Sequence, residues 1–281
     1  MLKIEIIGGL GNQLFQYATA LSIAKRNNTQ LVVDVSVMDN YDVHPLRLNK
    51  LKCTSKFINI NHYIKNTIYN KKMAMINPLV YKERKLTFDS NIFSVNKYSY
   101  LYGYFQSEKY FIDIRDVLLD EFDLMDESKE KNKDLIDMIT RKNSISLHIR
   151  RGDYLSNEAA NKTHGICDQT YYEKAIKVLE KKGRVDDNTI FYVFSDDIDW
   201  CKENINFGLN TKYIEGSSLE PEVDMYLMSL CENNIIANST FSWWAAWLNR
   251  NKTKIVIAPE KWFVNENMDD STLIPNSWIR L

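Results

Sequence analysis

Apolar residues at the start of the chain change from strand-like to helix-like spacing. A short apolar run covers residues 3–7, and glycines at positions 8, 9 and 11 interrupt it. Apolar side chains then recur at helical spacing, at Leu14, Tyr17, Ala18, Leu21 and Ala24. A β-branched run over 31–35 follows. The pattern predicts a strand, a glycine turn, a helix and a second strand, which together form a βαβ unit.

The next part of the chain has no clean hydrophobic period. Lysine, asparagine and tyrosine are mixed from about residue 40 to residue 100, which predicts loops with short helices. A further helix is expected over 106–120. Residues 125–143 are charged and polar, so we place the domain boundary there, with expected domains at 1–135 and 136–281. The alternative is a solvated helix face inside a single domain.

Beyond this boundary, strands and helices alternate regularly. The sequence predicts strands at 144–150, 189–195, 212–215, 235–237 and 254–258. The segments between them predict helices at 171–182, 198–203, 221–231 and 241–249. This alternation predicts an α/β fold with a parallel, doubly wound sheet, and the expected architecture is two such halves with a cleft between them.

Composition and charge restrict the function classes. The chain is 44% hydrophobic and 26% charged, and its net charge of -1 provides no bulk attraction to nucleic acid or an anionic membrane. A bound anion therefore needs a local cluster of donors. The cysteines at positions 53, 167, 201 and 231 are too scattered for a zinc or redox motif. The sequence contains no apolar run long enough to span a membrane, so a cytoplasmic location is expected.

A glycine-rich turn is the first candidate binding element. Gly9, Gly11, Asn12 and Gln13 lie between the first strand and the first helix, where a close approach of backbone to ligand is possible. A dinucleotide fingerprint with Asp34 on the next strand is one alternative, although leucine stands at the third glycine position. A turn that binds no ligand is another.

The second candidate is the stretch 148–153 at the end of a predicted strand. His148 and Arg150 point to one face of that strand, and Arg151 points to the other. Adjacent arginines need anions when they are buried, and a diphosphate would provide them. Asp153 can orient an arginine, and a purely structural ion-pair cluster with Asp153 is the equal alternative.

The third candidate is the start of the helix that follows the strand at 235–237. Ser239, Thr240 and Phe241 stand there, and a serine or threonine is expected to cap the helix. A helix N-terminus is also a phosphate site. The tryptophans that follow, at 243, 244 and 247, fit helix packing better than sugar stacking.

Acidic residues end the strand at 189–195. Asp196 and Asp197 follow it, and Asp197 with Asp199 spells D-x-D, a sequence that holds a divalent metal in some glycosyltransferases. A carboxylate at this position could instead accept hydrogen bonds from guanine.

Four segments together resemble a known family. The segments GGLGNQLFQYA, HIRRGDY, VFSDDIDW and NSTFSWWAAWL occur in the order typical of bacterial and animal α-1,2-fucosyltransferases of glycosyltransferase family 11. The resemblance extends from Gly8 to about Trp262. It implies a GT-B type fold, with two Rossmann-like domains facing a central cleft. The N-terminal domain would lie on the acceptor side, and the C-terminal domain would bind GDP-fucose.

The same resemblance implies roles for individual residues. Arg150 would hold the β-phosphate as a catalytic residue, with Arg151 and Asp153 supporting the motif. Asn12 is the second catalytic candidate, approaching fucose and acceptor from the other domain. His148, with Asp196 or Asp197, would contact the nucleoside. Ser239, Thr240 and Phe241 would contact the diphosphate. Gly9, Gly11 and Gln13 would line the cleft.

The implied reaction is inverting transfer of fucose to the 2-hydroxyl of a galactose-terminated acceptor, in the biosynthesis of a bacterial surface glycan. GDP-fucose is the co-substrate, and no metal or other cofactor is required. The expected partners exclude nucleic acid and include a possible lipid-linked glycan at the inner membrane, contacted peripherally. No general base is assigned among the candidates Asp34, Asp39, Asp153 and Glu222. The acceptor is expected to contact the region 36–105, with Asp39, Tyr41, His44 and Tyr104 as candidates.

Two other function classes stay open at this point. One is an NAD(P)-dependent oxidoreductase or epimerase, which would rest on Gly9, Gly11 and Asp34. The other is a catalytically silent sugar-nucleotide-binding or lectin-like module, which would bind GDP without releasing fucose to any acceptor.

Overall fold

The computed structural model describes residues 1–140, 143–151, 165–215, 220–265 and 267–281. Within these ranges the chain forms two compact units. The N-terminal unit comprises Met1–Asp123 with Asp269–Pro275, and the C-terminal unit comprises Leu124–Met268 with Asn276–Leu281. The expected boundary after residue 135 falls inside helix α5 (Lys133–Thr140), which belongs to the C-terminal unit together with α4 (Asp126–Lys131).

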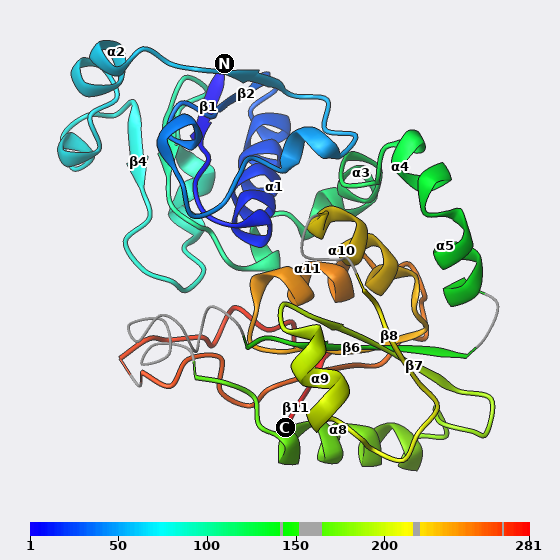
Figure 1. Cartoon of the computed structure of the whole chain (residues 1–281). Helices are drawn as coiled ribbons and strands as arrows, with labels where there is room; N and C mark the ends of the chain where they lie inside the picture. The colour runs from blue at the N-terminus through cyan, green and yellow to red at the C-terminus, as the bar shows by residue number, and fades with distance from the viewer. Residues whose placement is uncertain (141–142, 152–164, 216–219, 266) are drawn as a thin grey trace. The chain divides into compact units, whose positions relative to one another are not determined.

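The N-terminal unit contains a parallel sheet with the strand order β3-β2-β1-β5-β4 among its described residues. Helix α1 (Leu10–Arg26) packs on β1 and β2, which confirms the predicted βαβ unit (Figure 1). The strands are β1 (Leu2–Glu5), β2 (Leu31–Asp34), β3 (Lys56–Ile58), β4 (Val80–Lys82) and β5 (Tyr100–Tyr102). The remaining α-helices described in this unit are α2 (His62–Thr67) and α3 (Arg115–Glu121).

Two predictions for this unit were wrong. The region from 40 to 100 contains β3, β4 and β5 rather than only loops and short helices. The helix expected over 106–120 is broken into 3-10 turns at Glu108–Tyr110 and Ile112–Ile114, followed by α3. Each of these strands is three residues long, so none shows enough of an alternating pattern to be recognised from sequence.

The C-terminal unit contains a second parallel sheet, in which the described strands have the order β11-β10-β9-β6-β7-β8. Counted from β6, this is the 3-2-1-4-5-6 order of the Rossmann fold. The strands are β6 (Ser144–Ile149), β7 (Ile190–Ser195), β8 (Thr211–Tyr213), β9 (Asn233–Ile235), β10 (Val256–Ala258) and β11 (Ile279–Arg280). The helices between them are α8 (Gln169–Lys181), α9 (Ile198–Asn204), α10 (Pro221–Leu230) and α11 (Thr240–Leu248). Both the alternation and the parallel sheet were predicted.

Helices cover both faces of this second sheet. Helices α8 and α9 lie on one face, and α10 and α11 lie on the other (Figure 1). Strand β6 divides its side chains accordingly. Ile145, Leu147 and Ile149 join the apolar core with α8, while Ser146 accepts a hydrogen bond of 2.7 Å from Asn234 and His148 contacts Phe241 at the start of α11. The described helices include none with the length and apolarity that a bilayer crossing requires.

Candidate active site

The reversal of strand order in the C-terminal sheet lies between β6 and β9. Open parallel sheets bind ligands at this point, beside the carboxyl ends of the two strands. Arg150 follows β6 there, and the segment after β9 leads into Ser239, which precedes α11. The rings of His148 and Phe241 lie 5.5 Å apart, so the end of β6 and the start of α11 meet. Two of the sequence-predicted clusters therefore form one site.

The two arginines after β6 are held by the two aspartates after β7. Arg150 Nε lies 3.3 Å from Asp196 Oδ2, and Arg151 Nε lies 3.4 Å from Asp197 Oδ2. Asp196 Oδ1 also accepts a hydrogen bond of 2.8 Å from the main-chain N–H of Arg151. The guanidinium of Arg151 stacks 3.6 Å above the ring of Trp200.

This arrangement follows from the parallel register, because Ile149 is opposite Ser195 and the residues after them meet. The side chains of Arg150 and Arg151 are 22% and 23% exposed. They are therefore fixed in place and still reachable by an anion. The ion-pair partners are Asp196 and Asp197, whereas Asp153, which we expected beside the arginines, lies outside the described residues.

His148 is the buried polar side chain of the site, at 3% exposure. Burial, with a smaller effect from the charge of Arg150, lowers its pKa to about 3, so the imidazole is neutral at physiological pH. Its Nδ1 atom has no hydrogen-bond partner among the described residues. A buried polar atom without a partner is rare in folded proteins, and a ligand that hydrogen-bonds to it would explain it.

We predict that this histidine makes the protein less stable in mild acid. Its pKa falls from 6.5 to about 3 on folding, so the unfolded chain binds the extra proton between these values and stability decreases as pH drops through that window. The expected loss from His148 is about 2 kcal/mol between pH 7 and pH 5. Urea unfolding at both pH values should show a pH dependence smaller by this amount in His148→Gln. Equal dependence in the two proteins would contradict the buried, neutral state.

Helix α11 begins without the side-chain cap that the sequence predicted. Ser239 occupies the N-cap position, but no side-chain capping hydrogen bond forms there. Ser242 instead donates to the carbonyl groups of Ser239 and Ala237, at 3.3 and 3.4 Å. Thr240 and Phe241 are partly exposed at the site. The tryptophans at 243, 244 and 247 are buried against each other, which confirms their predicted role in packing.

The two carboxylates of the D-x-D sequence pair with different basic residues. Asp197 pairs with Arg151, whereas the Asp199 side chain is 89% exposed and pairs with Lys202 at 3.4 Å. Across the described ranges, no group of three or more histidine, cysteine, aspartate or glutamate side chains is placed to hold a metal ion.

In the N-terminal unit, the glycine turn is supported by Gln13. Its Nε2 atom donates to the carbonyls of Gly8 at 2.8 Å and Pro45 at 2.9 Å, and its Oε1 accepts from the N–H of Arg47 at 2.9 Å. Gln13 is fully buried, so these contacts make it a positioning residue for the turn and for the loop at 45–47. Gly8 has φ +90°, a conformation that glycine adopts without strain.

The turn itself carries Gly9, which is the N-cap of α1, and Gly11, which is buried in its first turn. A side chain added at Gly9 would meet the ring of His44 at 3.5 Å, so His44 lies directly over this glycine. His44 in turn is a neighbour of Tyr41, with ring centroids 6.5 Å apart. Two of the candidate acceptor residues thus lie beside the glycine turn.

Asn12 is joined to a residue that sequence reasoning missed. Its Oδ1 accepts a hydrogen bond of 2.8 Å from Gln106 Nε2. Asn12 follows β1 and Gln106 follows β5, so the pair occupies the point where the strand order of this sheet reverses. We predicted Gln106 only as the start of a helix, because nothing in the sequence indicates that β5 pairs with β1.

A partly buried carboxyl group, that of Glu83, shapes the segment before Gln106. Glu83 accepts hydrogen bonds from the N–H groups of Tyr104 and Phe105, at 2.7 and 2.9 Å. Burial raises the pKa of Glu83 to about 7, although these two N–H groups favour its ionised form. Phe105 adopts φ +55°, which is unfavourable for a bulky residue, and this contact helps to hold it there. Tyr104, a candidate acceptor residue, is left partly exposed.

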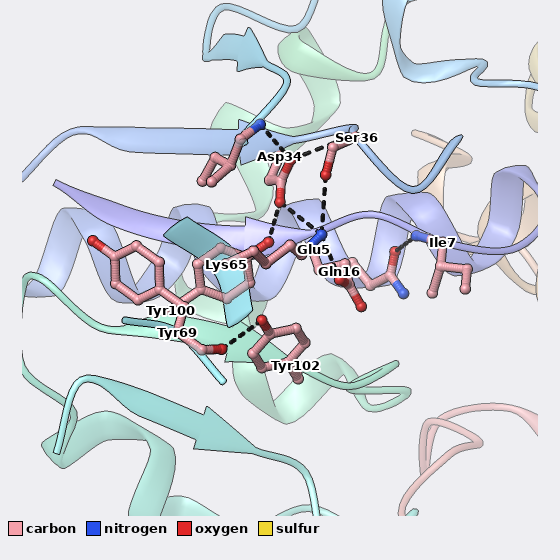
Figure 2. Close-up of polar contacts among 10 residues, drawn as sticks. Glu5, Ile7, Gln16, Asp34, Ser36, Lys65, Tyr69, Tyr100 and Tyr102 are labelled. Atoms are coloured by element: carbon pink, nitrogen blue, oxygen red, sulfur yellow. Dashed lines mark hydrogen bonds and ion pairs between the residues drawn. The ribbon is translucent and has the colours of Figure 1, made fainter. Parts of the chain in front are cut away.

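Asp34 is not positioned to bind a ribose hydroxyl. It is fully buried and accepts hydrogen bonds from Tyr100 Oη and the N–H groups of Ser36 and Ile60, and it pairs with Lys65 (Figure 2). The dinucleotide interpretation requires this carboxylate to bind a ribose hydroxyl, but these contacts already use it. They also count against Asp34 as a general base. Glu222 is buried as well, whereas Asp39 accepts a hydrogen bond from Asn59 at an exposed position.

Several known proteins are similar to this chain. The alpha-1,2-colitosyltransferase of Escherichia coli is 37% identical, over 99% of this chain and 97% of its own length. The Escherichia coli O-antigen biosynthesis glycosyltransferase WbnK is 34% identical, over 98% of both chains. Galactoside alpha-(1,2)-fucosyltransferase 2 of Sus scrofa is 26% identical, over 90% of this chain and 71% of its own length.

Solved structures share the fold. Fucosyltransferase NodZ from Bradyrhizobium matches with a TM-score of 0.50 and 14% identity, covering 87% of this chain and 91% of NodZ. A mutant of Arabidopsis thaliana FUT1 in complex with GDP matches with a TM-score of 0.52 and 12% identity, covering 92% of this chain and 70% of that protein. These matches confirm the predicted GT-B type fold. A family model described as Glycosyl transferase family 11 matches residues 1–281. The chain therefore belongs to glycosyl transferase family 11 and is a glycosyltransferase.

Proposed function

We propose that this glycosyltransferase transfers L-fucose from GDP-β-L-fucose to the 2-hydroxyl of a galactose-terminated acceptor, with inversion at the anomeric carbon. The observation that carries the proposal is the placement of Arg150 at the end of β6, beside the buried, neutral His148 and the start of α11. The site combines the cation of Arg150, the His148 Nδ1 atom without a hydrogen-bond partner among the described residues, and the N-terminus of α11. These features suit a nucleoside diphosphate.

Each group has a role in this proposal. Arg150, the hydroxyl of Ser239 and the main-chain N–H groups of Thr240 and Phe241 bind the diphosphate. His148 contacts the nucleoside. Asp196 and Asp197 hold the two arginines in place. The clusters in the N-terminal unit, which include Gly9, Gly11 and Asn12, contact fucose and the acceptor.

The reaction needs stabilisation of the leaving group above all. The bond between the anomeric carbon and the β-phosphate oxygen breaks, and a new bond forms from the acceptor 2-oxygen, which loses its proton. Negative charge grows on the diphosphate as it leaves. Fixed donors aimed at that charge lower the barrier without reorganisation. We assign no general base.

The test is a transfer assay with GDP-fucose and soluble β-galactosides, with the linkage read by NMR. A new α-1,2-linked fucose is the expected product. Transfer from a different nucleotide sugar alone would overturn the donor assignment, and GDP binding without transfer to any acceptor would favour a silent binding module.

A second donor is favoured by a specific observation, the 37% identity to an alpha-1,2-colitosyltransferase. Colitose differs from L-fucose in lacking the 3-hydroxyl group. A site that hydrogen-bonds this hydroxyl rejects the deoxy sugar by about 10⁴-fold or more, whereas an apolar contact discriminates only weakly. A competition assay with GDP-fucose and GDP-colitose distinguishes the two donors. If kcat/KM strongly favours GDP-colitose, colitose rather than fucose is the natural donor sugar.

We predict that the reaction requires no divalent metal. Asp197, which the D-x-D hypothesis needs as a ligand, is paired with Arg151, and the arginines supply positive charge in place of a cation. Initial rates with EDTA should equal those without it, and added manganese should not raise them. Loss of activity in EDTA that manganese restores would favour the metal-dependent alternative.

We further propose that the acceptor belongs to a surface glycan such as an O-antigen, assembled at the cytoplasmic face of the inner membrane. The similarity to an O-antigen biosynthesis glycosyltransferase supports this choice. An acceptor screen that compares O-antigen fragments with unrelated galactosides would test it.

A further inference from the structure

The chain between β3 and β4 joins the two opposite edge strands of the N-terminal sheet, and we call residues 59–79 the crossover. It covers the sheet face that carries Lys3, Glu5, Tyr100 and Tyr102. The ring of Tyr69 in the crossover lies 5.1 Å from the ring of Tyr100, and its carbonyl accepts a hydrogen bond of 2.7 Å from Tyr102 Oη. The crossover therefore takes the place that a long helix would fill in a Rossmann-like unit.

The crossover meets the sheet through apolar side chains at Ile60, Tyr69 and Ala74, but helix α2 is held by a polar contact. Lys65 points into the protein, where its Nζ atom lies 2.7 Å from Glu5 and 2.9 Å from Asp34, and it donates to Ser36 Oγ at 3.0 Å (Figure 2). Its side chain is 11% exposed. A single lysine, rather than a row of apolar side chains, thus anchors helix α2.

The outer side of the crossover exposes several large apolar side chains. Helix α2 has no buried residue. Met75 and Ile76 are 83% and 74% exposed. The large apolar side chains exposed along the crossover are Tyr63, Ile64, Ile68, Met73, Met75 and Ile76, which we call the crossover surface. Single exposed apolar residues are ordinary, but a concentration of them in one short segment indicates a surface that another phase or molecule covers.

The crossover also lies in the most basic part of the chain. From Val43 to Lys82 there is no aspartate or glutamate, and the basic residues are Arg47, Lys50, Lys52, Lys56, Lys65, Lys71, Lys72 and Lys82. Two of these lysines are paired with acidic residues from outside the stretch, Lys52 with Asp123 and Lys65 with Glu5 and Asp34. Lys71 and Lys72 are exposed and stand between Ile68 and Met73, within the apolar set.

We propose that the crossover surface, with Lys71 and Lys72, docks on a lipid bilayer that contains anionic phospholipids. The interface of such a bilayer offers negative headgroups next to an apolar acyl boundary, and the crossover presents lysines next to Ile, Met and Tyr side chains. Nucleic acid would match the charge but leave the apolar side chains in water. Docking of the same surface on a second copy would place the lysines of both copies against each other.

The biological role of this docking rests on the proposed function. A glycan acceptor built on a lipid carrier lies at the bilayer surface, so a transferase held there meets it at a raised local concentration. The contact itself depends on the crossover alone and can be measured without any donor or acceptor.

The experiment is sedimentation of the full chain with unilamellar vesicles of phosphatidylcholine, with or without phosphatidylglycerol. Wild type should bind only the anionic vesicles, and binding should weaken as salt rises. Lys71→Glu/Lys72→Glu should lower the partition coefficient by roughly 10-fold or more. Met75→Ser/Ile76→Ser should lower it by a similar factor, because it removes the apolar contribution.

The matched control is Lys181→Glu/Lys182→Glu, an equal charge change at an exposed lysine pair in the C-terminal unit. It should bind vesicles as wild type does. Transfer to a soluble galactoside is measured in parallel, and its absence in every protein, wild type included, would count against the proposed function and not against docking.

Equal binding to neutral and anionic vesicles, or equal binding by the crossover variants and the control, would overturn the proposal. So would binding that the lysine substitutions abolish and the Met75→Ser/Ile76→Ser change leaves intact, since this describes a purely ionic contact. A dimer that the crossover substitutions convert to monomer, with no vesicle binding, would identify a second copy as the occupant.

Discussion

Replacing Arg150 with alanine should lower kcat for transfer from GDP-fucose by at least ~100-fold, the scale of losing one fixed donor to a charge that grows in the transition state. Arg150 is the candidate for this role because it follows β6 beside His148, and Asp196 holds its Nε at 3.3 Å. A guanidinium carries five N–H donors, and under the proposed function Arg150 uses such donors to bind the β-phosphate. Steady-state kinetics with a soluble galactoside give the measurement.

Two further variants separate catalysis from structure. Arg184→Ala removes an arginine of the same unit that donates to the carbonyl of Thr253, and it should leave kcat unchanged. Arg150→Lys keeps the charge but loses the planar fork, so it should fall between wild type and alanine. Near-full activity of a folded Arg150→Ala protein would remove Arg150 from the mechanism.

Lys65→Met should destabilise the protein by about 3–5 kcal/mol, the usual cost of removing one partner from a buried ion pair. The substitution leaves two carboxylates, Glu5 and Asp34, facing each other with little water around them. Urea unfolding followed by circular dichroism gives the free energy of unfolding. The loss should appear in the transition of the N-terminal unit if the two units unfold separately.

The exposed Lys72→Met is the matched control and should change stability by less than about 0.5 kcal/mol. Lys65→Met combined with Asp34→Asn should lose less than the sum of the two single changes, because the pair is coupled. Burial opposes ionisation of Asp34, but the hydrogen bonds from Tyr100 and Lys65 outweigh it and lower its pKa below 3.8. The stabilisation is therefore present above pH 3.8 and is lost as pH falls below it. A fully additive double mutant would contradict this coupling.

The amino-acid sequence was a good guide to the C-terminal unit for a physical reason. Strands β6 and β7 are six residues long and fully buried, and both have a recognisable pattern: β6 alternates Ile145, Leu147 and Ile149 with polar residues, and β7 is an almost continuous apolar run. The residues that follow such strands collect at one edge of the sheet. The proximity of His148, Arg150, Asp196 and Phe241 could therefore be expected from the sequence alone.

The N-terminal unit was less predictable, because its strands are short and its pairings are distant in sequence. Lys56–Ile58 and Val80–Lys82 each combine one lysine with two apolar or aromatic residues, which is too short for a recognisable strand pattern. The contact of Asn12 with Gln106, and that of Glu83 with Tyr104, exist only once β4, β5 and β1 are aligned. Parallel pairing over such separations leaves no local pattern in the sequence.

Capping of α11 shows a further limit of sequence reasoning. Serine at an N-cap position is favourable on average, yet Ser239 makes no such bond here. The hydroxyl of Ser242, one turn later, bonds to the carbonyl of Ser239 instead. The residue type was correct for a cap, but the orientation of its hydroxyl depends on neighbours that the sequence does not place.

Strand β6 contains positions that affect stability and positions that affect the candidate site. Ile145, Leu147 and Ile149 are part of the apolar core with α8, whereas His148 and the following Arg150 belong to the candidate site on the other face. Substitution at positions 145, 147 and 149 should therefore alter mainly heat resistance, whereas substitution at positions 148 and 150 should alter turnover or donor preference. Ser144 and Ser146 are buried and hydrogen-bonded, so a library aimed at donor choice is best restricted to positions 148 and 150.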